Sequence, residues 1–127
     1  MKYLLDTHVV IWYFENSAEL PKKIEQLIDD PENSIYIPAA SLWEIAIKMS
    51  LGKLDLQLKL EDLLEIIRSR DFNILQIDDE YLRELYLLPF IHKDPFDRLI
   101  IATALAERLT IMTIDENIQK YNVHWIW

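Results

Sequence analysis

The sequence of 127 residues contains no cysteine and a single glycine, and each scarcity removes a class of chemistry. Without cysteine there is no disulfide framework, no cysteine-based zinc site and no thiol nucleophile. One glycine is too few for a glycine-rich loop that wraps a phosphate group. Reactive groups must therefore come from carboxylates, imidazoles, hydroxyls and amines.

Long apolar runs are also missing, which bears on the compartment. The longest strongly apolar stretch, 99–106, is far shorter than the roughly 20 residues that a membrane-spanning helix needs. Near the N-terminus, Asp6 and His8 interrupt the apolar start too early for the hydrophobic region of a signal peptide. We therefore expect a cytoplasmic protein.

Basic side chains are outnumbered, because 13 Lys and Arg stand against 22 Asp and Glu and give a formal net charge of −9. This balance argues against a protein that binds nucleic acid through a broad positive surface. Hydrophobic residues make up 51% of the chain, enough for a folded core. No linker or repeat divides the sequence, so we expect a single domain over residues 1–127.

Short apolar segments alternate with segments of helical spacing along the chain. We expect strands at 3–5, 34–37, 72–77 and 111–113, and a final edge strand at 123–126. The helices expected between them cover 9–14, 17–28, 39–50, 60–70, 79–88, 94–109 and 115–120. This alternation predicts an α/β fold with parallel strand pairing and helices on both faces. In such sheets ligands bind at the carboxyl ends of the strands.

Acidic residues stand where two of these strands end. Asp6 follows the first strand and Asp115 follows the fourth, so both are expected on one rim of the sheet. Asp97, at the start of the helix before the fourth strand, and Glu44, in the helix after the second, can reach the same crevice. Carboxylates suit Mg²⁺ or Mn²⁺, and such a metal can activate water and stabilise a leaving oxygen. The pattern is therefore compatible with metal-assisted hydrolysis of a phosphodiester.

The same acids also have a structural interpretation, which the pattern alone leaves open. Asp at a strand-to-helix junction is a common N-cap, and this applies to Asp6, Asp94 and Asp115. Pro95 directly after Asp94 favours the cap interpretation for Asp94, because proline is favoured at the first helical position.

Several segments, taken in their order and spacing, resemble the PIN-domain family and, within it, the VapC-like ribonuclease toxins of toxin–antitoxin pairs. They are Leu4-Leu5-Asp6-Thr7-His8, Ser41 to Lys48 with Leu51-Gly52-Lys53-Leu54, Asp94 to Ala102, and Thr113-Ile114-Asp115. The resemblance implies a three-layer α/β/α sandwich, an acidic pocket for Mg²⁺ or Mn²⁺, and endonucleolytic cleavage of RNA. It also implies a homodimer and a cognate antitoxin protein as partners.

Carried over by position, the resemblance implies a catalytic and metal-binding quartet, which consists of Asp6, Glu44, Asp97 and Asp115. Glu44 would either ligate the metal or accept a proton from the attacking water. Thr113 resembles the hydroxyl residue that precedes the family's last acid, and we expect it to orient a carboxylate or water. Asp94 is a further acid nearby, either a helix cap or a competitor of Asp97 for metal.

Residues near the quartet are candidates for substrate binding: Thr113, Lys48, Arg98, His92 and His8. Lys48 and Arg98 could contact phosphate. Lys48 also has the spacing of an ion pair with Glu44, and Arg98 could be an ordinary surface residue of its helix. His8, which stands where many relatives have Asn, and His92 could shuttle a proton or serve as polar packing residues.

Other functions remain open. A metal-dependent DNA nuclease or phosphatase also uses clustered acids. A non-catalytic receiver-like module needs an acidic pair after its first strand, where this chain has Asp6-Thr7. A partner-binding module with an inactive site is disfavoured by the complete quartet. The 4 tryptophans are expected mostly in the core, because aromatic side chains bury large areas.

Overall fold

The computed structural model describes residues 1–127 and contains one five-stranded sheet with helices on both faces. The strands are β1 (Lys2–Leu5), β2 (Ser34–Pro38), β3 (Asn73–Leu75), β4 (Thr110–Met112) and β5 (Trp125–Ile126). The helices are α1 (Thr7–Phe14), α2 (Lys22–Asp29), α3 (Ala39–Ser50), α4 (Leu60–Ser69), α5 (Asp79–Leu87), α6 (Pro95–Glu107) and α7 (Glu116–Gln119). All neighbouring strands are parallel, as predicted.

The order of the strands determines where a site can form. The sheet runs β3-β2-β1-β4-β5, so the chain moves outward from β1 to β3 and then returns to place β4 on the other side of β1. Leu5, the last residue of β1, is paired with Met112, the last residue of β4. The two strands end level and their connections leave in opposite directions, so their carboxyl ends form the topological switch point where sheets of this kind bind ligands.

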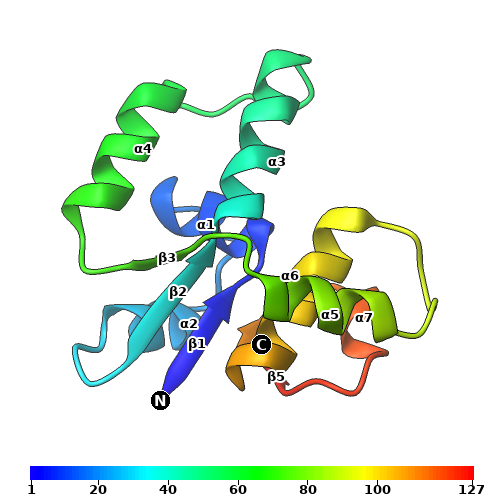
Figure 1. Ribbon diagram of the computed structural model, residues 1–127. Helices are drawn as coiled ribbons and strands as arrows, with labels where there is room; N and C mark the ends of the chain where they lie inside the picture. Colours follow the sequence, from blue (N-terminus) through cyan, green and yellow to red (C-terminus); the bar gives the residue numbers. More distant parts are fainter.

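Alternate strand residues face two separate cores. Tyr3 and Leu5 of β1 belong to the core that includes side chains of α1, α2, α3 and α4, whereas Leu4 faces the core that includes α6 and α7. Figure 1 shows α5, α6 and α7 together on one side of the sheet, with α5 packed against α6. The predicted three-layer α/β/α sandwich is confirmed. None of the helices has the length and apolarity that crossing a membrane requires.

Two helix starts differ from the prediction, each because of the residue in front of it. The helix expected over 17–28 begins only at Lys22, with Pro21 at its N-cap position and turns before it. The first helix begins at Thr7 instead of residue 9, because the Asp6 carboxylate accepts a hydrogen bond from the Thr7 N–H and caps it. This early start fixes Thr7 beside Asp6 at the sheet edge.

Candidate active site

The carboxyl ends of β1 and β4 carry Asp6, Thr113 and Asp115. Asp6 is buried; its Oδ1 accepts from the Thr7 N–H at 2.7 Å and its Oδ2 from the Thr113 hydroxyl at 2.7 Å. The Thr113 hydroxyl oxygen in turn accepts from the backbone N–H of Asp115 at 2.9 Å. Thr113 therefore orients the Asp6 carboxylate and ties it to the start of the next helix.

Asp94 and Asp115 both cap helices, with different consequences. Asp94 Oδ1 accepts from the Asp97 N–H at 2.9 Å, and Pro95 follows at the first helical position of α6, so the cap interpretation of Asp94 is confirmed. Asp115 Oδ1 accepts from two backbone N–H groups of α7 at 2.7 and 3.3 Å. Because its side-chain hydrogen bonds use Oδ1 alone, Asp115 keeps Oδ2 available while it caps α7.

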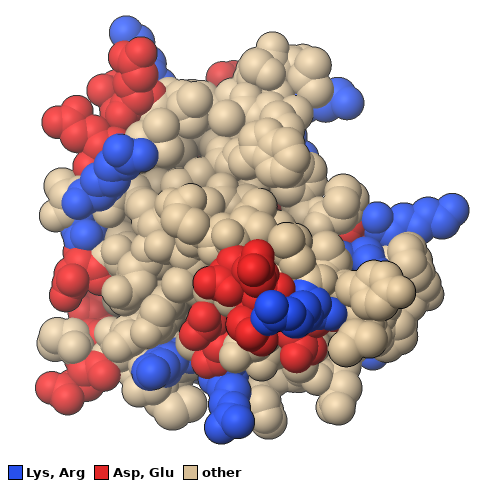
Figure 2. Space-filling model, in the orientation of Figure 1, with Lys and Arg blue, Asp and Glu red and all other residues tan.

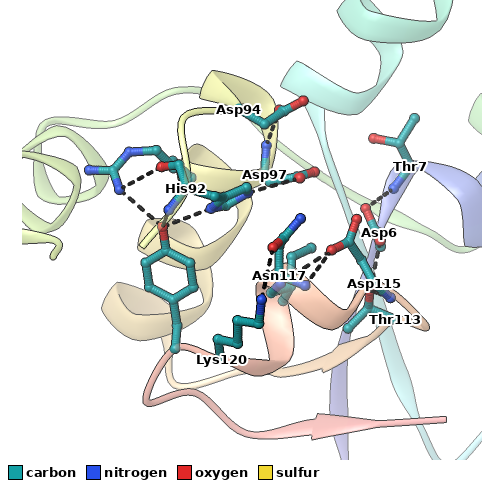
Figure 3. A network of polar contacts seen from close by, with 12 residues as sticks. Asp6, Thr7, His92, Asp94, Asp97, Thr113, Asp115, Asn117 and Lys120 are labelled. Carbon is teal, nitrogen blue, oxygen red and sulfur yellow. Dashed lines mark hydrogen bonds and ion pairs between the residues drawn. The ribbon is translucent and has the colours of Figure 1, made fainter. Parts of the chain in front are cut away.

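Asp97 approaches the same strand ends from the first turn of α6. Its Oδ2 lies 3.1 Å from Nε2 of His92, a residue of the loop before that helix. Burial raises the pKa of Asp97 to about 7 against the opposing effect of the His92 hydrogen bond, and the charges of neighbouring carboxylates add to the rise. Those neighbours include Asp6 and Asp115, and Figure 3 shows the three carboxylates facing a common space.

The electrostatics around these carboxylates fit a cation. Burial raises the pKa of Asp6 as well, although the hydrogen bonds from Thr113 and Thr7 act in the other direction. In both groups burial is the main cause, because it disfavours the ionised form, which a bound cation would favour. Hard oxygen donors of this kind suit Mg²⁺ or Mn²⁺. No three His, Asp or Glu side chains are already spaced as a metal-binding shell, so the donor chemistry fits a divalent cation while the coordination geometry is not preformed.

Glu44 lies in α3 with partners of its own. Its Oε1 accepts from the Thr7 hydroxyl at 2.7 Å, and its Oε2 lies 2.9 Å from Lys48 Nζ, which confirms the predicted i, i+4 ion pair. This hydrogen bond raises the pKa of Lys48. Thr7 thus connects the two acids, because its N–H donates to Asp6 and its hydroxyl donates to Glu44.

Three residues of this network were not identified from the sequence as site residues: Thr7, Ser41 and Tyr121. Ser41 Oγ lies 3.1 Å from Thr7 Oγ1, and its position three residues before Glu44 on one helix face was a usable signal. Thr7 stands next to Asp6 and could have been found as the first residue of a capped helix. Tyr121 is remote in sequence from every acid, so only the fold reveals its contact with His92.

The position of Arg98 in the structure favours neither of the two roles predicted for it. It is buried, and its guanidinium donates to the carbonyls of Pro89 at 2.9 Å and Leu88 at 3.3 Å, just after α5. It also stacks 4.0 Å over the ring of Phe90. The structure argues against the expected phosphate contact, because the α5–α6 packing encloses the side chain and its donors serve backbone carbonyls. The alternative of a surface residue is wrong for the same reason.

The prediction that most tryptophans lie in the core is also wrong. Trp43 and Trp125 are 59% and 44% exposed, and Trp12 and Trp127 are only partly buried. Trp43 packs edge-on against Phe96 with ring centroids 5.3 Å apart. Since Trp43 precedes Glu44 and Phe96 precedes Asp97, this aromatic pair joins the two helices that carry those acids.

The rest of the surface reflects the excess of acidic over basic residues in the sequence. Figure 2 shows acidic side chains gathered over the beginning of α5, where Asp79 and Glu80 lie, with separate basic side chains around them. This face carries no continuous basic stripe. His8 is exposed beside Asp6, and its ring packs 5.6 Å from that of Trp12.

The carboxylates thus converge at the topological switch point of a parallel sheet, where α/β proteins bind their ligands. The family model for the PIN domain matches residues 3–123, and the chain belongs to the PIN domain family. PIN domains are nucleases, which places this chain in a nuclease family.

Solved structures of similar fold include toxin–antitoxin complexes. VapBC2 from Rickettsia felis, bound to a DNA fragment from its promoter, has a TM-score of 0.73 at 19% identity and covers 99% of this chain and 98% of the compared chain. VapBC-1 from nontypeable Haemophilus influenzae has a TM-score of 0.70 at 17% identity, over 99% and 97%. FitAcB from Neisseria gonorrhoeae has a TM-score of 0.69 at 21% identity, over 98% and 96%. No curated protein matches the sequence significantly.

Proposed function

We propose that this PIN-domain protein is a Mg²⁺- or Mn²⁺-dependent endoribonuclease and the toxin of a toxin–antitoxin pair. The observation that carries the proposal is the group of carboxylates, Asp6, Asp97 and Asp115, which face one space where β1 and β4 end. Burial raises the pKa of Asp6 and of Asp97, so a nearby cation would stabilise both ionised carboxylates.

The roles of the acids follow from their surroundings. Asp6, Asp97 and Asp115 would hold the metal, which, when bound, supplies a Lewis acid for the phosphate and the means to activate water. Thr113 orients Asp6 through its 2.7 Å hydrogen bond. Glu44 either contributes a fourth carboxylate or takes a proton from the water, and its link to Asp6 through Thr7 keeps it beside the site.

Single-stranded RNA is the substrate that we infer. A net charge of −9 rules out binding by charge alone, so local contacts must contribute. Trp43, exposed beside Glu44 and supported by Phe96, offers a ring on which an unpaired base can stack. Lys48 is paired with Glu44 at 2.9 Å, and its Nζ can turn from Glu44 to a phosphate. The preference for RNA over DNA rests on the family resemblance. We also propose that the protein acts in the cytoplasm.

A protein partner is the second part of the proposal. An apolar groove between α3 and α4, lined by Leu42, Trp43, Leu60 and Leu64, is suited to the segment of an antitoxin. An antitoxin that also carries an Arg or Lys could offset the charge of the carboxylates. We further propose a homodimer, which the exposed apolar side chains of α5 and the following loop support: Leu82, Tyr86, Leu87, Phe90 and Ile91.

The decisive experiment measures cleavage of single-stranded RNA by wild type and Asp6→Asn, with Mg²⁺ or Mn²⁺ and with EDTA. We expect cleavage only by the wild type with metal, and an unchanged fold for the variant by circular dichroism. Duplex DNA and a phosphomonoester serve as parallel substrates, because preferential turnover of either would replace the ribonuclease proposal. Full activity in Asp6→Asn, with normal metal affinity, would show that the site lies elsewhere.

A further inference from the structure

The hydroxyl of Tyr121 lies at the centre of a buried hydrogen-bond network behind Asp97. Its oxygen is 3.2 Å from the backbone nitrogen of His92, 3.1 Å from Nη1 of Arg98 and 2.8 Å from Nδ1 of His92. The Tyr121 residue is 5% exposed, and the His92 side chain is 12% exposed. Figure 3 shows the imidazole of His92 turned toward Asp97.

Counting donors and acceptors leaves one arrangement of hydrogens. A backbone N–H and an arginine guanidinium can only donate, and a phenol oxygen has two lone pairs and one hydrogen. The bonds from His92 N–H and Arg98 occupy both lone pairs, so the phenol hydrogen must point to His92 Nδ1. Nδ1 then accepts, and the proton of the neutral ring is carried by Nε2.

The proton on Nε2 points at the acidic site, because Nε2 lies 3.1 Å from Asp97 Oδ2. We propose that Tyr121, held by Arg98, fixes the tautomer of His92 so that its Nε2–H anchors Oδ2 of Asp97. His92 is then a positioning residue for the Asp97 carboxylate and not a proton shuttle, and Oδ1 of Asp97 is left for the common space. The consequence for cleavage rests on the proposed nuclease function, whereas the tautomer does not.

The assignment also gives the buried Arg98 a function. Its guanidinium is anchored by the carbonyls of Leu88 and Pro89, so its donor toward Tyr121 is fixed in place by the α5–α6 packing. The chain of contacts therefore runs from the helix pair, through Arg98 and Tyr121, to His92 and Asp97. Metal ligands in proteins are commonly oriented by such outer partners, and loss of one costs about 10- to 100-fold in activity or metal affinity.

A first experiment reads the tautomer in the metal-free protein by long-range ¹H–¹⁵N NMR of the histidine rings at pH 8. We expect His92 to be the Nε2–H form in wild type and a mixture of both forms in Tyr121→Phe. The exposed rings of His8 and His124 serve as internal controls that should not change between the two proteins. A His92 ring in the Nδ1–H form in wild type overturns the inference, and that result requires no variant to fold.

A second experiment compares His92→Gln with His92→Asn, using kcat and KM for RNA. The amide nitrogen of Gln takes the place of Nε2 and can donate to Asp97, whereas the amide of Asn takes the place of Nδ1 and cannot reach it. We expect about a 10- to 100-fold loss of kcat in His92→Asn, recovery in His92→Gln to within about threefold of wild type, and little change in KM. Equal loss in both variants would indicate proton transfer by His92 and overturn the positioning role. If wild type cleaves nothing, the proposed function fails and the NMR result alone decides the tautomer.

Discussion

Glu44 and Asp97 flank Asp6 from opposite sides of the sheet and are held in opposite ways. Glu44 has a cation of its own, Lys48 at 2.9 Å, and a hydroxyl donor in Thr7. The Asp97 carboxylate has a single side-chain partner, the imidazole of His92, and burial raises its pKa to about 7. The fold therefore supplies the charge balance of Glu44 and leaves that of Asp97 incomplete.

This difference separates a carboxylate that the protein itself stabilises from one that a ligand must stabilise. A buried acid without a cation costs folding free energy when it ionises, and that cost is recovered when a cation binds. The Asp97 side thus requires a ligand to balance its charge, whereas Glu44 is already paired within the fold. Each of the following predictions changes one side and leaves the other intact.

The largest effect is expected from Asp97→Asn. Removal of a metal-binding carboxylate should lower RNA cleavage by about 1,000-fold, because transition-state charge is no longer balanced. The same change should stabilise the metal-free protein at pH 8, since a buried charge is removed. Asp94→Asn is the matched control, because Asn is an equally good helix cap and should keep most activity. Equal losses of RNA cleavage in both variants would contradict the assignment of Asp97 as a metal ligand and Asp94 as a helix cap.

Arg98→Met should lower the stability of the protein and leave phosphate binding unchanged. The side chain is buried and donates to two carbonyls and the Tyr121 hydroxyl, so we expect a loss of about 3 kcal/mol in urea unfolding. Arg83→Met, on the exposed surface of α5, should change stability by less than about 0.5 kcal/mol. A stable Arg98→Met protein with a raised KM for RNA would restore the phosphate contact that the structure argues against.

The pH dependence of stability tests the raised pKa of Asp97. Because its folded pKa, about 7, lies above its ordinary value of 3.8, the folded state binds a proton that the unfolded chain has released. The resulting stability is complete below the ordinary value and is lost as pH rises through 7. Metal-free wild type should therefore melt at a lower temperature at pH 8 than at pH 5.5, and Asp97→Asn should show a smaller difference. Mn²⁺ should raise the melting temperature of wild type more at pH 8, where the carboxylate is ionised.

The smallest effect is expected on the Glu44 side. Lys48→Met removes the cation beside a buried carboxylate but leaves the Thr7 hydrogen bond, and the Lys48 side chain is 39% exposed. We expect a loss of about 1 kcal/mol in unfolding free energy, and a smaller loss when Glu44→Gln is added. Additive losses in the double variant would mean that the ion pair contributes nothing and that Glu44 is stabilised in another way.

Much of the site was predictable because its signals are local. Asp6 and Asp115 follow short apolar segments that favour strands, and Asp94-Pro95 is a typical helix start. The ion pair of Glu44 with Lys48 requires nothing beyond helical spacing. Where local signals compete, the prediction failed. The apolar spacing placed the start of a helix at residue 17, whereas the helix begins only after Pro21.

The sequence by itself determined the α/β alternation, the acids at the strand ends and the helix caps, because each depends on residues within a few positions of one another. Only the tertiary structure decided that Arg98 is enclosed, that Trp43 is exposed and that Tyr121 meets His92. Burial and contact between distant residues depend on how α5 packs against α6 and where α7 returns the chain. For the same reason, the tertiary structure decided which acid is balanced within the fold and which is left for a cation.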